Sequence, residues 1–320
     1  MKEYVLLYNG RRRVYIVEKI KEYLKHLNKD IGICITDTDK LDPVAYHGDK
    51  FFIVPPIEDK DWSKKIIPLL KKNNIKYIFL WNNKDFMPFY KIKDELEKEN
   101  IKILLPSIDV INICFDKKLT NEFALNNNIL TPTTFYSIED FIKNPIDFPV
   151  LIKPSHGAGN MNIFKAYNIE ELEILYKRVP DPIIQEFIDG FQVTIDIFYD
   201  KDVKAIVPRK RVKVRDAEVV QASIILDDYL IETATKVANA LNTDGPLNIQ
   251  VMCRDNKAYL IDLHPRFGGG TDLSIEAGVD IHKWIINMLL GIENNYNYKL
   301  NNKLFMTRYL KSEFFEMSDL

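Results

Sequence analysis

Apolar positions in the first hundred residues alternate between two spacings. Short apolar runs such as Tyr4–Tyr8 and Ile31–Ile35 have the length and composition of buried strands. Between them, from Val14 to Leu27, apolar residues recur every three or four positions, which predicts an amphipathic helix. Further strands are expected at Phe51–Val54, Ile75–Trp81 and Ile101–Leu105, and further helices at Trp62–Leu70 and Lys91–Glu99. This alternation predicts a parallel sheet with helices on both faces.

The pattern changes after Pro106. Two short helices are expected first, at Ser107–Ile113 and Lys117–Asn127, then two strands, Phe148–Lys153 and Met161–Ala166, and a helix at Ile169–Arg178. From Ile183 onward long strands dominate, interrupted by a helix at Tyr229–Leu241. The chain is therefore expected to be an α/β protein with an N-terminal parallel, Rossmann-like domain at residues 1–106. A two-lobed α+β module follows, with a small lobe at 107–188 and a large lobe at 189–320.

Composition excludes several classes of protein. Hydrophobic residues make up 46% of the chain and charged residues 28%, which argues against global disorder. The net charge of −2 argues against a general binder of nucleic acid or of anionic membranes. No apolar run approaches the ~18 residues of a membrane span, and MKEYVLLYNG is too short an apolar segment for a signal peptide. Cys34, Cys114 and Cys253 stand far apart and are expected to be free thiols in a cytoplasmic protein.

A glycine-containing loop joins two expected strands after Lys153. It contains Ser155, Gly157 and Gly159, and it runs from strand to strand, whereas a P-loop runs from a strand into a helix. Such a loop can close over phosphates, with backbone N–H groups as donors and Lys153 as a charge. The alternative is an ordinary hairpin turn.

Four polar residues are expected on one face of an antiparallel pair of strands. Asn248 and Gln250 alternate on the first strand, and Asp262 and His264 on the second, after a turn at residues 254–257. Burying such groups without partners costs about 1–3 kcal/mol each, so a hydrophilic ligand is expected there. Oxygen ligands favour Mg²⁺ bridged to phosphate, with Arg266 countering the transferred charge. A polar network that satisfies itself is the alternative.

Two further features could bind anions. The run Gly268-Gly269-Gly270 precedes an expected helix at Thr271–Ala277, and successive glycines can turn their N–H groups inward as an anion nest. The other is the turn Gly10–Arg13, whose three arginines could grip an anion or simply line a solvated helix start.

These motifs, taken in order, resemble those of ATP-grasp enzymes, and among them single-unit relatives of the carbamoyl-phosphate synthetase large subunit. The resemblance covers nearly the whole chain. It is carried by the N-terminal sheet domain, Asp116-Lys117, Phe148–Pro154 with its glycine loop, Ile184–Gly190, Asn248–Gln250 and Ile261–Gly270.

The resemblance implies a role for each matching residue. Lys117 and Lys153 would bind the ATP phosphates beneath the loop of Ser155, Gly157 and Gly159, while Glu186 and Ile188 would hold the adenine and Gln192 the ribose. Gln250, Asp262 and His264 stand at metal-ligand positions, and Arg266 at the position that steadies the γ-phosphate and the acyl phosphate. The chain departs from the family pattern at three of these positions, where Gln192 and Asp262 replace Glu and His264 replaces Asn.

The basic run Pro208–Glu218 borders the acceptor site in the resembling family. As a strand, it would place Arg209, Arg211, Lys213 and Arg215 on one face. We expect Arg211, Arg215 and Glu218 to bind the substrate together with Gly268, Gly269 and Gly270. A solvated strand edge is the alternative.

The function predicted from the resemblance is an ATP-dependent ligase that joins a carboxylate to an amine, or to a related nucleophile, through an acyl phosphate. Its cofactors would be ATP and Mg²⁺ or Mn²⁺, the latter favoured by the His264 imidazole. Its partners would be small-molecule carboxylates and amines, without nucleic acid or membrane, and a homodimer is compatible with the sequence. Catalysis needs no histidine-activated nucleophile, and His47, His156 and His282 have no recognisable partners in the sequence.

Three alternatives to this ligase differ in how well the sequence supports them. An ATP-binding sensor or partner subunit with weakened catalysis is favoured by Asp262 and His264. An NAD-dependent enzyme is disfavoured because GxGxxG is absent. True carbamoyl-phosphate synthesis is disfavoured because the sequence has one ATP-grasp unit and no glutaminase.

Overall fold

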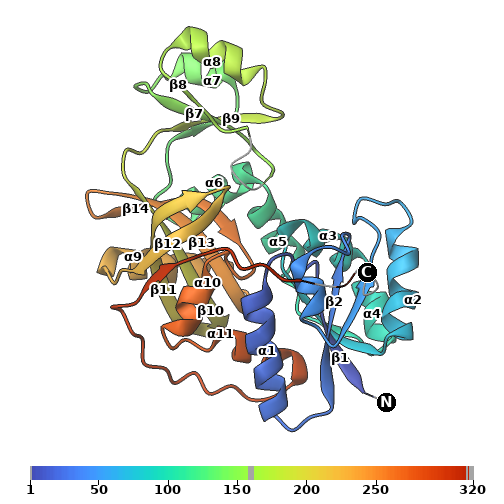
Figure 1. The fold of residues 1–320 in the computed structure, drawn as a ribbon. Coiled ribbons are helices and arrows are strands. Elements are labelled where there is room, and N and C mark those ends of the chain that lie inside the picture. Colours follow the sequence, from blue (N-terminus) through green and yellow to red (C-terminus); the bar gives the residue numbers. More distant parts are fainter. Residues whose placement is uncertain (1, 158–161, 315, 317–320) are drawn as a thin grey trace. The chain divides into compact units, whose positions relative to one another are not determined.

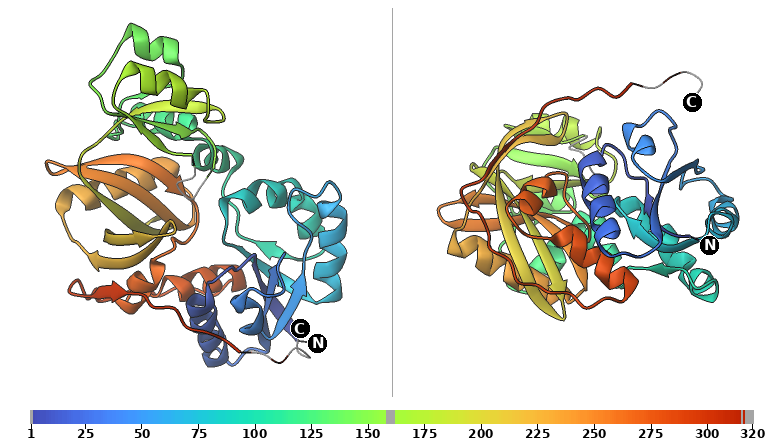
Figure 2. Two further views of the ribbon diagram at one scale, coloured as in Figure 1. Left: turned by 45° about the horizontal axis from the view of Figure 1, so that its top comes forward. Right: turned by 60° about the horizontal axis from the view of Figure 1, so that its bottom comes forward.

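The structure is a computed structural model that describes residues 2–157, 162–314 and 316 (Figure 1). Gly159 of the expected loop therefore lies outside the described residues. The chain divides into two compact units. The first comprises residues 1–108, 274–300 and 308–320, and the second comprises residues 109–273 and 301–307. The two further views in Figure 2 show the same elements.

The first unit is built on a five-stranded parallel sheet, as predicted, with the strand order β3-β2-β1-β4-β5. The strands are β1 (Glu3–Tyr8), β2 (Ile31–Asp37), β3 (Lys50–Ile53), β4 (Ile75–Leu80) and β5 (Lys102–Ile103). The helical segments are α1 (Val14–His26), η1 (Pro43–Tyr46), α2 (Trp62–Lys72), α3 (Asn83–Lys91), α4 (Lys93–Lys98) and α11 (Ile281–Leu290).

Two helices of this unit were not expected from the sequence. The stretch that forms α3 contains Pro88, which removes a helical hydrogen bond and suggests a loop. Phe86 and Phe89 are nonetheless buried, and their packing favours the helix. Helix α11 packs against α1 although more than 250 positions separate them, for example through Tyr23 Oη, which donates to Asn287 Oδ1 at 2.7 Å.

The second unit contains two antiparallel sheets. The larger has the strand order β14-β13-β10-β11-β12-β15 and the smaller has the order β6-β9-β7-β8. The larger sheet consists of β10 (Phe191–Asp200), β11 (Asp202–Arg215), β12 (Glu218–Ile224), β13 (Gly245–Arg254), β14 (Lys257–His264) and β15 (Phe305–Thr307). The smaller consists of β6 (Thr134–Phe135), β7 (Val150–Pro154), β8 (Phe164–Ala166) and β9 (Pro182–Glu186). The helices are α6 (Lys117–Asn126), α7 (Ile138–Lys143), α8 (Ile169–Tyr176) and α9 (Asp228–Leu241). Two helices cross the division of the chain, because α5 (Ile108–Phe115) begins at residue 108 and α10 (Thr271–Glu276) ends after residue 273.

The two faces of the larger sheet differ in polarity. On one face, Val193, Ile195 and Ile197 of β10 pack with apolar residues of β13, β14 and the helices α5, α6 and α9. Since successive residues of a strand point to opposite faces, Gln192, Thr194 and Asp196 occupy the other face. One sheet therefore supplies a hydrophobic core on one side and a polar floor on the other.

Several predictions about the fold can now be compared with the structure. The hairpin across residues 254–257 is confirmed, because Asn248 lies opposite His264, and Gln250 opposite Asp262. The loop after Lys153 joins two antiparallel strands, β7 and β8, also as predicted. The cysteines are free and buried. The predicted boundaries divide the chain differently from the two units, since residues 274–300 group with the N-terminal sheet. Among the described residues no helix has the length and apolarity needed to cross a bilayer.

Candidate functional site

Polar side chains follow two rows across the polar face of the larger sheet. In the first row Arg209, Thr194, Gln250 and Asp262 are neighbours on β11, β10, β13 and β14. In the second row Asp196, Asn248 and His264 are neighbours on β10, β13 and β14. Residues directly opposite each other in antiparallel strands share a face, so cross-strand pairing alone gathers these groups.

Asp262 is the carboxylate around which cations gather. Burial acts to raise its pKa, but His264, Lys117 and Lys153 act in the opposite direction and hold the pKa well below the usual range. His264 Nε2 lies 3.2 Å from Asp262 Oδ2. Burial lowers the pKa of His264 despite this carboxylate, and the Arg266 charge lowers it further. The site therefore combines an ionised Asp262, a neutral imidazole and several cations.

Lys153 reaches this cluster from the smaller sheet. It lies on β7, and only 6% of its surface is exposed. Burial lowers the pKa of Lys153 to about 8. The charge of Asp262 acts to raise this pKa, and the smaller effect of Lys117 lowers it. A lysine whose ammonium has lost its water is stabilised by any anion that comes into contact with it.

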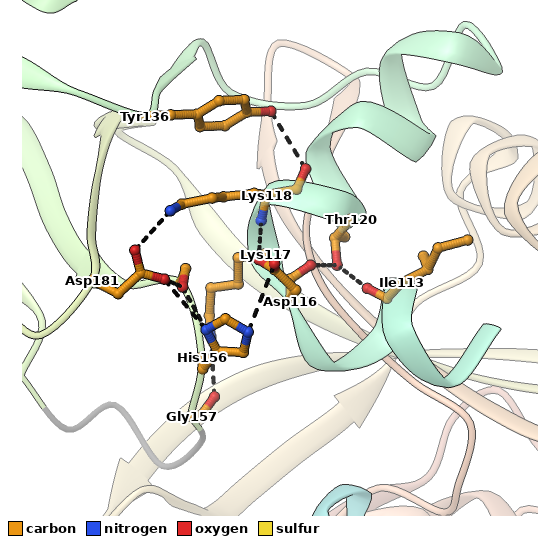
Figure 3. Close-up of polar contacts among 10 residues, drawn as sticks. Ile113, Asp116, Lys117, Lys118, Thr120, Tyr136, His156, Gly157 and Asp181 are labelled. Carbon is orange, nitrogen blue, oxygen red and sulfur yellow. Dashed lines mark hydrogen bonds and ion pairs between the residues drawn. The ribbon is translucent and has the colours of Figure 1, made fainter. Parts of the chain in front are cut away.

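The first residues of the glycine loop are tied to the start of α6 (Figure 3). The backbones of Asp116 and His156 form a bridge, and the N–H of Lys117 donates to the carbonyl of Ser155 at 2.9 Å. Lys117 Nζ donates to the carbonyl of Gly157 at 3.0 Å, and Gly157 has a φ of 118°, which side chains rarely tolerate. The structure thus places these residues of the loop close to Lys117.

The expectation that His156 has no partner is wrong. Its Nδ1 lies 2.7 Å from Ser155 Oγ and 3.4 Å from Asp181 Oδ2, and its Nε2 lies 3.7 Å from Asp116 Oδ2. Asp181 also bonds the hydroxyl of Ser155 and pairs with Lys118 at 2.7 Å. His47 likewise lies 3.2 Å from Glu18. Asp181 and Asp116 lie 25 and 40 positions from His156, so sequence patterns could not reveal these partners.

The side-chain oxygen of Gln250 accepts hydrogen bonds from two other side chains. Its Oε1 accepts from Gln192 Nε2 at 2.7 Å and from Arg211 Nη1 at 3.2 Å. An amide oxygen has two lone pairs, so this arrangement leaves it little capacity to bind a cation. Among the described residues no group of three or more His, Cys, Asp or Glu side chains could hold a metal ion. The carboxylate of Asp262 fits a divalent cation, and the Gln250 oxygen, as oriented here, does not.

The expected adenine and ribose residues lie near the junction of β9 and β10. Glu186 accepts at 3.2 Å from both the backbone N–H and the hydroxyl of Thr133, and it lies 3.6 Å from Arg254. Ile188 is 2% exposed, so its side chain is buried. Gln192 lies farther along and contacts Gln250 as described.

The basic strand differs from expectation beyond Arg211. Arg209 is buried and Arg211 half-buried, and register shifts between Arg211 and Val214 interrupt the regular pairing with β12, so the shared face of all four residues stays a prediction. Arg215 and Glu218 lie opposite each other at an exposed hairpin end. Burial and the neighbouring Arg209 lower the pKa of Arg211.

The three successive glycines have different surroundings. A Cβ on Gly268 or Gly270 would meet side-chain nitrogen at 2.4 Å, whereas a Cβ on Gly269 would meet nothing within 4 Å. None of the three has a left-handed φ, and the anion nest stays a prediction. Gly269 is exposed and is the member that can face a ligand.

The arginines of the Gly10–Arg13 turn belong to the first unit. Arg11 and Arg12 have φ values of 30° and 43°, and the guanidinium of Arg13 lies over the Trp81 ring at 5.7 Å. Arg11 also lowers the pKa of the buried Asp85, which burial raises to about 7. Protein groups thus account for Arg11 and Arg13.

Comparison with known proteins agrees with this architecture. A family described as ATP-grasp in the biosynthetic pathway with Ter operon matches residues 178–311, and the PylC-like N-terminal domain matches residues 5–104. The chain therefore contains an ATP-grasp domain, which the family model matches over residues 178–311. The first of these matches includes the strands that carry Gln192, Gln250, Asp262 and His264.

Relatives by sequence are carbamoyl-phosphate synthases. The chain is 26% identical over 266 residues to the carbamoyl-phosphate synthase of Methanobrevibacter smithii, covering 76% of this chain and 70% of the relative. It is 26% identical over 221 residues to the large chain of Caldanaerobacter subterraneus, covering 62% of this chain and 21% of that protein. The match thus spans about a fifth of the latter's length.

Solved structures share the fold of this chain. Biotin carboxylase of Campylobacter jejuni superposes with a TM-score of 0.75 at 18% identity, covering 93% of this chain and 73% of the neighbour. The N5-carboxyaminoimidazole synthetase of Staphylococcus aureus, solved with ADP, has a TM-score of 0.75 at 13% identity. The superposition covers 96% of this chain and 82% of that protein.

We predict that nucleotide affinity falls as pH rises through the pKa of Lys153, which is about 8. The ammonium form predominates below this pKa and binds phosphate. One pH unit above it only about a tenth of the groups stay charged. Calorimetric titration with MgATP from pH 7 to 9 should show weakening affinity and, near pH 8, proton uptake on binding.

Lys153→Arg is the matched control for this prediction. A guanidinium stays charged across the whole range, so its affinity profile should be flatter. Identical pH profiles for the two proteins would show that Lys153 is not the titrating contact.

Proposed function

We propose that this ATP-grasp protein is an ATP-dependent ligase that joins a carboxylate to an amine, or to a related nucleophile. The observation that carries the proposal is the charge around Asp262. Lys117 and Lys153 lower its pKa, and the charge of Arg266 acts on its neighbour His264. Two lysines beside one carboxylate, with Arg266 near the adjacent His264, suit a polyphosphate.

The residues of the site would divide the work of nucleotide binding. Lys117 and Lys153 would bind the phosphates beneath Ser155 and Gly157, with Glu186, Ile188 and Gln192 at the adenine and ribose. Asp262 would hold Mg²⁺ or Mn²⁺ together with phosphate oxygens, and Gln250 and His264 would join it only after reorienting. A bound divalent cation supplies charge neutralisation for the transferring phosphoryl group.

Two group transfers would complete the reaction. A carboxylate oxygen of the substrate attacks the γ-phosphorus of ATP, the bond to the β-phosphate oxygen breaks, and ADP leaves. The amine then attacks the acyl phosphate carbon, the C–O bond to phosphate breaks, and an amide, phosphate and a proton result. Phosphoryl transfer depends mainly on positioning and electrostatic stabilisation, which Lys153 and Arg266 would provide.

The acceptor would lie beside the glycine turn. Arg211 is half-buried and bonded to Gln250, so its guanidinium is fixed in direction. Its positive charge, together with the exposed backbone of Gly269, suits a substrate carboxylate. Arg215 and Glu218, at the exposed hairpin end, would contact only a longer substrate.

Substrate profiling tests the proposed function. Purified protein is incubated with MgATP, or with MnATP, and with pooled amino acids and other small carboxylates and amines, and phosphate release is measured. Release of ADP and phosphate that requires both a carboxylate and an amine supports the ligase. ATP binding by calorimetry without turnover in any pool would instead support a sensor or partner subunit.

We predict that Asp262→Asn abolishes phosphate release and leaves the fold intact. A neutral amide is a poor ligand for a divalent cation, so both metal binding and turnover should fall at least tenfold. Mn²⁺ binding in the presence of ATP, followed by electron paramagnetic resonance, supplies a readout other than activity. Normal turnover by a folded Asp262→Asn protein would show that the carboxylate is structural.

Gly269→Ala should affect the acceptor and not the nucleotide. A methyl group there meets no protein atom within 4 Å, so the variant should fold normally. The methyl would project into the proposed acceptor position and raise the acceptor KM about tenfold or more, with ATP affinity unchanged. Unaltered turnover of every substrate would place the acceptor elsewhere.

A further inference from the structure

A buried ion pair lies beneath the glycine turn. Arg209 and Asp196 are only 1% and 2% exposed. Arg209 Nε donates to Asp196 Oδ2 and Nη2 donates to Oδ1, each at 2.9 Å, which is a bidentate pair. Removing two charges from water costs several kcal/mol per ion unless geometry and further hydrogen bonds compensate. The pair therefore depends on the groups around it.

Two further donors bind the carboxylate of Asp196. Asn248 Nδ2 donates to Asp196 Oδ1 at 2.6 Å, and the hydroxyl of Thr271 donates to the same oxygen at 3.1 Å. Thr271 is the first residue of α10 and directly follows Gly270. Asp196 thus connects the floor of the sheet to the end of the glycine turn.

The guanidinium and the Asn248 amide also lie against the turn itself. A Cβ on Gly270 would lie 2.4 Å from Arg209 Nη1. A Cβ on Gly268 would lie 2.4 Å from Asn248 Nδ2 and 3.1 Å from Arg209 Nη2. Glycine is required at both positions because the side chains below leave no space for a Cβ. Gly269 between them has open space and is exposed.

We propose that Arg209 is a positioning residue that holds the Gly268–Gly270 turn in place for the acceptor. The inference rests on the proposed ligase only for its effect on catalysis. Arg209 is too deeply buried to touch a substrate, so it acts through the turn. Replacing Arg209 should loosen the turn and weaken acceptor binding. The residues proposed to bind ATP and metal, Lys117, Lys153 and Asp262, should keep their positions.

The first test is hydrogen exchange in Arg209→Lys. Lysine keeps a positive charge beside Asp196 but lacks the planar fork that lies against both glycines. Exchange at Gly268–Thr271 should accelerate about tenfold or more, with MgATP affinity within about twofold of the unmodified protein. Lys236→Ala, on the exposed face of α9, is the control and should change neither. Unchanged exchange in a folded Arg209→Lys protein would overturn the proposal.

Thr271 provides a smaller perturbation in case Arg209→Lys does not fold. Thr271→Val preserves shape and removes only the hydroxyl that binds Asp196, so it should accelerate exchange at the turn. Thr271→Ser restores the hydroxyl and should return exchange to the original rate. Equal exchange in the Val and Ser variants would overturn the role of this contact.

A double variant tests direct contact between Arg209 and Gly270. Gly270→Ala should lower the melting temperature, because its methyl would overlap Arg209 Nη1. In an Arg209→Lys background that nitrogen is absent, so the same methyl should cost less. Strictly additive effects would show that the two residues do not constrain each other.

The catalytic consequence is measured as phosphate release from MgATP with pooled amino acids. Arg209→Lys should raise the acceptor KM about tenfold at nearly unchanged ATP affinity. Faster exchange with an unaltered acceptor KM would overturn the positioning role. Absence of acceptor-dependent turnover in the unmodified protein would overturn the ligase proposal, and hydrogen exchange would still decide whether Arg209 holds the turn.

Discussion

The electrostatic balance around Asp262 is the constraint on which the rest of the second unit depends. A buried carboxylate is tolerated only beside positive charge, and a buried ammonium such as that of Lys153 only beside negative charge. Burial lowers the pKa of Lys153 to about 8 even though Asp262 acts to raise it. A polyanion in contact with Lys153 would stabilise its charged form, which links the fold to nucleotide binding.

Strand periodicity made much of the site predictable. Alternation placed Asn248 and Gln250 on one face, and the turn after them brought Asp262 and His264 opposite. Both inferences need only neighbouring residues and the geometry of an antiparallel pair. The same reasoning could not foresee the register shifts after Arg211, because they depend on the partner strand β12, which was not expected.

Interactions between distant residues could not be read from the sequence. Arg209 stood in a basic run that was expected to border the acceptor site, with a solvated strand edge as the alternative, and its ion pair is with Asp196, thirteen positions earlier in the chain. Tertiary packing likewise brings Asp181 to Ser155 and Lys118. It also brings the Gln250 oxygen to the side chains of Gln192 and Arg211. The grouping of residues 274–300 with the N-terminal sheet has the same origin.

The Arg209–Asp196 pair places two buried charges on the polar face of the larger sheet, where apolar residues would avoid the cost of removing charge from water. Replacing a buried ion pair by well-packed apolar residues is often neutral or stabilising, so Arg209 and Asp196 are not needed for stability alone. An apolar side chain, however, offers no directed contact to Thr271 or to the backbone of Gly268 and Gly270. The pair thus specifies the position of a turn whose middle residue, Gly269, remains open to a ligand.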